Sequence, residues 1–110
     1  MTVWYQVRDL DAARGFYVSK LGFAERYFDE EGRWIKLDRG DMEIAIAEGD
    51  PVEGGVAHVE VEDVKAEAER LRGEGVEVGT VLELHGEVRL VDVFDPDGNR
   101  IQLAQELSSR

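Results

Sequence analysis

The sequence contains no cysteine, only two prolines and no long apolar run. The absence of cysteine excludes disulfides, thiolate metal sites and thiol nucleophiles. No stretch approaches the roughly 18 consecutive apolar residues that a membrane-spanning helix needs. The first residues also lack the basic segment and apolar run that mark a signal peptide. We therefore expect a cytoplasmic protein with no membrane partner.

Positive charge is scarce as well. The chain has 13 lysines and arginines against 25 aspartates and glutamates, which gives a formal net charge of −12. Because lysine and arginine neutralise phosphates in nucleic-acid complexes, this balance argues against nucleic acid as a partner. It would instead attract a cationic small molecule or a metal ion, although an acidic surface also serves solubility alone.

The chain contains an internal repeat. Residues 2–12 return in residues 56–66, an offset of 54 (56 minus 2), and residues 41–45 return in residues 100–104, an offset of 59 (100 minus 41). Duplicated units of this size usually share one core, and a ligand pocket often lies where they meet. We predict one domain over 1–110, with module 1 at 1–49, a linker at 50–55 and module 2 at 56–107.

Each module is predicted to run in the order β-α-β-β-β. In module 1 a strand over 2–8 is followed by a helix that Asp9 caps and Gly22 ends, then by strands near 23–29, 33–38 and 42–47. In module 2 a strand over 56–61 precedes a helix that Asp63 caps, then strands near 76–84, 88–94 and 100–106. The predicted fold class is therefore α+β.

Two groups of segments carry a family resemblance. The first is Val7-Arg-Asp9-Leu10 leading into Phe16-Tyr17 and Leu21-Gly22-Phe23, and the second is the turn and strand over 95–103, Asp-Pro-Asp-Gly-Asn-Arg-Ile-Gln-Leu. With the repeat, they resemble the vicinal-oxygen-chelate superfamily of glyoxalase I, bleomycin-resistance proteins and extradiol dioxygenases. The resemblance implies an eight-stranded curved sheet, or cup, with helices on its outer face. It also implies a homodimer with two symmetric cavities.

Metal-dependent members of that superfamily place four ligands on the concave face. By the resemblance, these positions fall on Thr2, Glu43, Val56 and Gln102. Threonine and valine stand where imidazoles are usual, and valine has no lone pair to offer. We therefore predict no metal cofactor and no catalytic residue. A divalent metal in a rearranged set, His58 with Glu43, Glu60, Gln102 or Glu106, is the alternative.

The strand faces that do not enter the core should line the cup. Trp4 and His58 match across the repeat, and an indole facing an imidazole suits a flat aromatic ligand. Nearby carboxylates would favour a cation. The predicted ligand-binding residues are Trp4, Gln6, Trp34, Glu43, His58, Glu60, Gln102 and Glu106.

Three functional hypotheses follow from these observations. The favoured one is a metal-free, small-molecule-binding protein that holds an aromatic or cationic ligand in a dimer cavity. The first alternative is a metal-dependent lyase, isomerase or dioxygenase with a rearranged site. The second is a degenerate module that binds no ligand and serves oligomerisation.

Overall fold

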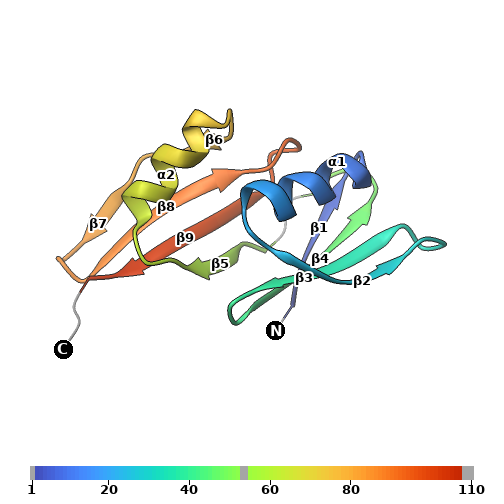
Figure 1. The fold of residues 1–110 in the computed structure, drawn as a ribbon, viewed down its shortest axis with the longest axis horizontal. Helices are drawn as coiled ribbons and strands as arrows, with labels where there is room; N and C mark the ends of the chain where they lie inside the picture. The colour runs from blue at the N-terminus through green and yellow to red at the C-terminus, as the bar shows by residue number, and fades with distance from the viewer. Residues whose placement is uncertain (1, 53–54, 108–110) are drawn as a thin grey trace.

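The structure, a computed structural model, describes residues 2–52 and 55–107, so residues 53–54 of the predicted linker lie outside the described residues. The first half comprises β1 (Thr2–Val7), α1 (Leu10–Gly15), η1 (Phe16–Lys20), β2 (Ala24–Asp29), β3 (Trp34–Arg39) and β4 (Met42–Glu48). The second comprises β5 (Ala57–Glu60), α2 (Val64–Gly73), β6 (Glu77–Val78), β7 (Leu82–Leu84), β8 (Val88–Phe94) and β9 (Arg100–Glu106). The fold is α+β, as predicted (Figure 1).

The described strands form two sheets. Sheet A has the order β1-β4-β3-β2, and sheet B has the order β5-β9-β8-β6, with β7 also paired to β8. The first strand of each half pairs in parallel with the last strand of the same half. The strand predicted near 76–84 is interrupted between Val78 and Leu82, where the backbone amide of Gly79 donates to Asp92 O at 2.8 Å.

Both helices begin as predicted. Asp9 and Asp63 each accept a 3.1 Å hydrogen bond from the backbone amide three residues later, which satisfies a free donor of the first turn. After α1 the helix widens into the π-helical turn η1, in which Leu21 N donates to Phe16 O, five residues earlier. This turn places both Phe16 and Tyr17 in the core. No helix of the described residues is long and apolar enough to cross a membrane.

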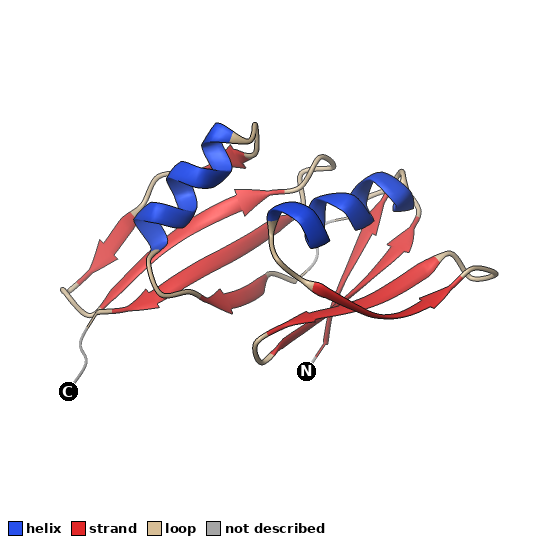
Figure 2. Cartoon of the chain, in the orientation of Figure 1, coloured by secondary structure: helices blue, strands red, loops and turns tan. Residues whose placement is uncertain are grey.

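The two helices cover the same side of the molecule. Figure 2 shows α1 above sheet A and α2 above sheet B, with the sheets side by side along the long axis of a body measuring 47 × 27 × 24 Å. Alternate strand residues such as Ile35, Ile44 and Ile101 are buried on the helical side. On the opposite side of each sheet, called the open face below, none of the described residues forms a helix.

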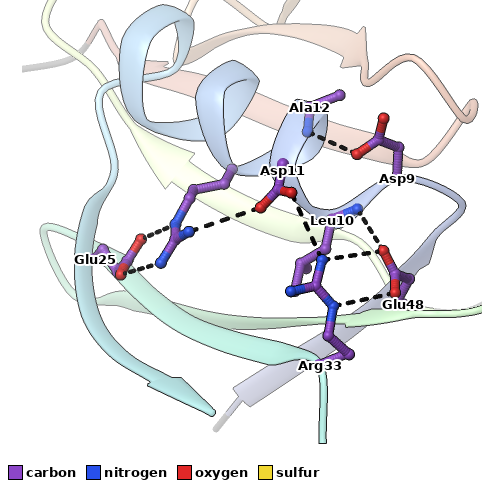
Figure 3. A network of polar contacts seen from close by, with 8 residues as sticks. Asp9, Leu10, Asp11, Ala12, Glu25, Arg33 and Glu48 are labelled. Carbon is purple, nitrogen blue, oxygen red and sulfur yellow. Dashed lines mark hydrogen bonds and ion pairs between the residues drawn. The ribbon is translucent and has the colours of Figure 1, made fainter. Parts of the chain in front are cut away.

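An ion-pair network fixes the strands of sheet A to the start of α1. Arg33, before β3, lies 3.2 Å from Glu48 at the end of β4 and 3.7 Å from Asp11 of α1 (Figure 3). Glu48 also accepts a 3.1 Å hydrogen bond from Leu10 N. The Arg33 guanidinium lowers the pKa of Glu48, and the Leu10 amide adds to this effect. The network thus connects β3 and β4 of sheet A, which contribute to its open face, to the start of α1.

Candidate functional site

Three aromatic rings meet on the open face of sheet A. The ring centroids of Trp4 and Trp34 are 5.6 Å apart, and those of Tyr27 and Trp34 are 5.2 Å apart. Trp4 pairs with Ala45 and Trp34 pairs with Ala47, so methyl groups lie beside both indoles. Trp4 is 55% exposed and Tyr27 is 51% exposed. The open face therefore presents an apolar aromatic surface to solvent.

Tyr27 belongs to this cluster but was not predicted. Strict alternation from the buried Phe23 places residue 27 on the core side of the strand. The register of β2 against β3 shifts between Glu25 and Tyr27, which is a β-bulge. The extra residue turns the Tyr27 ring to the open face, and simple periodicity cannot show such a shift.

The remaining predicted residues of the first half lie on the same open face. Gln6 pairs with Ala47, which pairs in turn with Trp34. Glu43 pairs with Thr2 and accepts a hydrogen bond from its hydroxyl. The structure therefore gathers Trp4, Gln6, Trp34 and Glu43 on one surface.

The predicted residues of the second half gather on the open face of sheet B. His58, Gln102 and Asp92 form one row across β5, β9 and β8. Gln102 Oε1 lies 3.0 Å from His58 Nδ1, and Gln102 Nε2 donates to Asp92 Oδ1 at 3.4 Å. Arg100 donates to the other carboxylate oxygen at 3.3 Å. Asp92 was missed, although its polar position between the buried Val91 and Val93 is the signal that could have found it.

Two hollows adjoin this row. A groove of about 470 Å³ between the β3–β4 turn and β5 is lined by Arg39, Gly40, Asp41, Met42, His58 and Glu60. A smaller hollow of about 210 Å³ includes Leu82, Leu90, Asp92 and Gln102 in its lining. Glu106 is exposed and pairs with Val88 near the far end of β9. Glu60 pairs with Ala104, two residues before Glu106 on β9, so both carboxylates lie toward the same end of sheet B's open face.

The register changes the expected correspondence between the two halves. Thr2 pairs with Glu43, but the partner of Gln102 is His58 rather than Val56. Val56 precedes β5 and lines a different pocket, of about 510 Å³, with Tyr5 and Phe94 among its walls. Gln102 therefore lies beside His58, the match of Trp4 in the repeat, and not beside Val56, the match of Thr2.

The donor set does not fit a metal ion within this chain. Thr2 and Glu43 are on sheet A, Gln102 is on sheet B, and Val56 has no donor atom. Among residues 2–52 and 55–107, no three His, Asp or Glu side chains are close enough together to hold an ion. Within the part of the chain that the structure describes, His58 is likewise not gathered with Glu43, Glu60 or Glu106 into such a group.

Two buried tyrosines join the halves beneath the open faces. Tyr5 donates to Arg100 O at 2.6 Å and accepts from Ala57 N at 2.8 Å. Burial raises the pKa of Tyr5 to about 12. Burial and the adjacent Asp95 carboxylate raise the pKa of Tyr17 well above its usual range. Both hydroxyls are therefore structural donors at neutral pH.

Solved structures similar to the chain share its fold. An integron cassette protein, HFX_CASS4, from the mobile metagenome of the Halifax Harbour sewage outfall aligns with a TM-score of 0.84 at 20% identity over 96% of each chain. Lactoylglutathione lyase from Agrobacterium tumefaciens aligns with a TM-score of 0.77 at 19% identity, over 96% of this chain and 91% of that one. TnmS3, an antibiotic-binding protein from Streptomyces sp. CB03234, aligns with a TM-score of 0.78 at 26% identity, over 96% and 93%.

Among curated proteins, none matches the sequence significantly. The sequence profile of one family does match, and it covers residues 2–103, which is nearly the whole chain. That extent includes both halves of the repeat up to the middle of β9. The chain belongs to the glyoxalase/bleomycin resistance protein/dioxygenase superfamily.

Proposed function

We propose that this protein binds a small aromatic or cationic molecule without a metal, in a cavity that a second copy of the chain completes. The observation that carries the proposal is the aromatic cluster of Trp4, Trp34 and Tyr27 on the open face of sheet A. Exposed rings beside small alanines offer a flat surface on which a planar ligand can stack. An indole face also attracts a cation.

The need for a second copy is supported by what the open faces expose. In addition to Trp4 and Tyr27, Leu82 on sheet B is 54% exposed and Leu84 is 46% exposed. Apolar surfaces of this kind commonly mark interaction sites on soluble proteins. A second copy that covers both open faces would remove these apolar side chains from water. It would also enclose the space between the copies as a cavity.

The metal-free character is supported by the chemistry of the donor positions. Glu43 is bonded to the Thr2 hydroxyl, and Gln102 is bonded to His58 and Asp92. Each of these groups therefore already has a protein partner. The proposal also agrees with the antibiotic-binding activity stated for TnmS3, a relative of similar fold at 26% identity.

Tryptophan emission, followed while 9-aminoacridine is added, tests the proposal. This probe is planar and cationic, so saturable quenching is expected. Trp4→Ala should weaken binding at least about tenfold, because it removes roughly one aromatic contact with the probe. Trp4→Phe keeps a ring at this position and should retain most of the affinity. Absence of saturable quenching with this and other planar aromatic cations would contradict the proposal.

Metal analysis separates this proposal from the enzymatic alternative. The protein is purified without chelator and its divalent metal content is measured. A content far below one ion per chain is expected. A stoichiometric ion that is lost in both His58→Ala and Glu43→Ala would favour the lyase, isomerase or dioxygenase hypothesis.

A further inference from the structure

The hydrogen-bond row on sheet B has a direction. A carboxylate only accepts hydrogen bonds, so Asp92 Oδ1 requires the amide nitrogen of Gln102 to face it, as observed at 3.4 Å. The amide oxygen of Gln102 then points toward His58 Nδ1, 3.0 Å away. Because that oxygen only accepts, His58 Nδ1 must carry the proton. A neutral imidazole has one N–H, so Nε2 is left with its lone pair.

Arg100 reinforces this direction. It donates to Asp92 Oδ2 at 3.3 Å, so the second oxygen of this carboxylate also acts as an acceptor. The opposite orientation of the Gln102 amide would place its oxygen against the Asp92 carboxylate, two acceptors facing each other without a proton. Each hydrogen bond of the row is therefore donated in the same direction, from His58 to Gln102 and from Gln102 to Asp92.

His58 also lines the 470 Å³ groove between the β3–β4 turn and β5. The charged groups there are Asp41, Glu60 and Arg39. The Arg39 guanidinium is engaged elsewhere, donating to Leu21 O at 2.7 Å and lying 3.8 Å from Glu67. Among the described residues, the side chains of Asp41 and Glu60 form no hydrogen bond or ion pair. The groove therefore offers acceptors and negative charge.

We infer that His58 is a specificity-determining acceptor, which selects ligands that carry an N–H donor on a cationic group, and that Asp92, acting through Gln102, is its positioning residue. This inference rests on the proposed function, because it names the ligand class of that binding protein. A protonated amine fits the groove by both charge and hydrogen bonding. An anionic ligand, or a cation without N–H groups, does not satisfy the His58 lone pair.

The proton position is tested by long-range ¹H–¹⁵N NMR of the imidazoles at about pH 8, where an ordinary histidine is neutral. His58 is expected to carry its proton on Nδ1. His85, in an exposed turn, serves as a reference within the same spectrum. Asp92→Asn and Gln102→Met should shift His58 toward the Nε2-protonated form, and the surface control Glu87→Gln should not. An Nε2-protonated His58 in the unaltered protein would overturn the inference.

The ligand class is tested by calorimetry with two probes that share a ring and a charge. These are 1-naphthylmethylammonium and its N,N,N-trimethyl derivative, which has no N–H group. One charge-assisted hydrogen bond corresponds to about tenfold tighter binding of the first probe. His58→Leu should abolish that difference, and Asp92→Asn should reduce it while leaving the fold intact by circular dichroism.

The outcomes separate this inference from the proposed function. Equal affinity for the two probes would overturn the role of His58 and leave the binding function standing. If neither naphthyl probe binds although 9-aminoacridine, which also carries N–H donors, does, an alkylammonium group is not the donor that His58 selects. If no aromatic cation binds at all, both the proposed function and the ligand class assigned here fall.

Discussion

The hydroxyl of Tyr17 donates a 2.8 Å hydrogen bond to Asp95 Oδ2, across 78 positions of the sequence. Tyr17 lies in η1 of the first half, and Asp95 begins the turn between β8 and β9 of the second. Both side chains are buried. The Asp95 carboxylate also accepts hydrogen bonds of 2.9 Å from Asp97 N, Asn99 N and Asn99 Nδ2. A single carboxylate therefore organises the turn and fastens it to the other half.

We predict that Asp95→Ala destabilises the fold far more than Tyr17→Phe. Removal of the carboxylate leaves several buried donors without partners, each costing about 1–3 kcal/mol, so a total loss of about 3 kcal/mol or more is expected. Tyr17→Phe removes one donor and leaves the carboxylate three others, so about 1–2 kcal/mol is expected. Urea denaturation measures both free energies of unfolding.

The control for this experiment is Asp97→Asn. Asp97 forms an ion pair with Arg8 at 3.0 Å, but the Arg8 side chain is 68% exposed. A pair of this kind contributes at most about 1 kcal/mol. If Asp97→Asn proved as costly as Asp95→Ala, the central role of the buried carboxylate would be refuted.

The stability of the protein should decline in alkali through Tyr5. Its pKa is raised from 10.0 to about 12, chiefly by burial. As the pH rises, the unfolded chain therefore loses the Tyr5 proton before the folded chain does. The contribution of Tyr5 to the free energy of unfolding is fully present below pH 10.0 and is lost as the pH rises toward about 12. Tyr5→Phe should lower stability at neutral pH and flatten its decline over that window. Unfolding curves collected across the window test this, and identical slopes for the two proteins would contradict it.

In acid, the relevant group is Glu48. Its pKa is lowered below 4.5, first by the hydrogen bond from Arg33 and then by that from Leu10 N. The Glu48 carboxyl group thus binds a proton less tightly in the folded state than in the unfolded state. Its contribution to the free energy of unfolding is therefore lost as the pH falls below 4.5. Glu48→Gln should reduce the difference between the thermal midpoints at about pH 6 and about pH 3. An undiminished difference would show that other carboxylates dominate acid unfolding.

Local chemistry made much of the fold predictable. The caps Asp9 and Asp63 and the alternating faces of β1 and β9 depend on interactions within a few residues, and the structure confirms them. The turn at 95–98 is likewise held by local interactions, because Asp95 accepts hydrogen bonds from Asp97 N and Asn99 N.

Pairing between strands was harder to predict, because register depends on turn length as well as on residue type. Two residues separate β3 from β4, and five separate β8 from β9. The offset of 59 was found by matching residue types and takes no account of this difference in turn length. It therefore predicts that Gln102 lies beside Val56, whereas the observed register places His58 beside Gln102. The bulge at Tyr27 is a second case, since the sequence near residues 25–27 carries no glycine to mark it.

The last prediction concerns association through the open faces. Leu82 lies on the open face of sheet B, whereas Val18, which is 40% exposed, lies in η1 on the helical side. If a second copy covers the open faces, Leu82→Asp should shift the protein toward monomer in sedimentation velocity experiments, because it buries an unpaired charge in the interface. Val18→Asp, the matched control, should leave the sedimentation coefficient unchanged. Equal effects of the two substitutions, or a monomeric unaltered protein at high concentration, would mean that the aromatic face of sheet A binds its ligand without a partner.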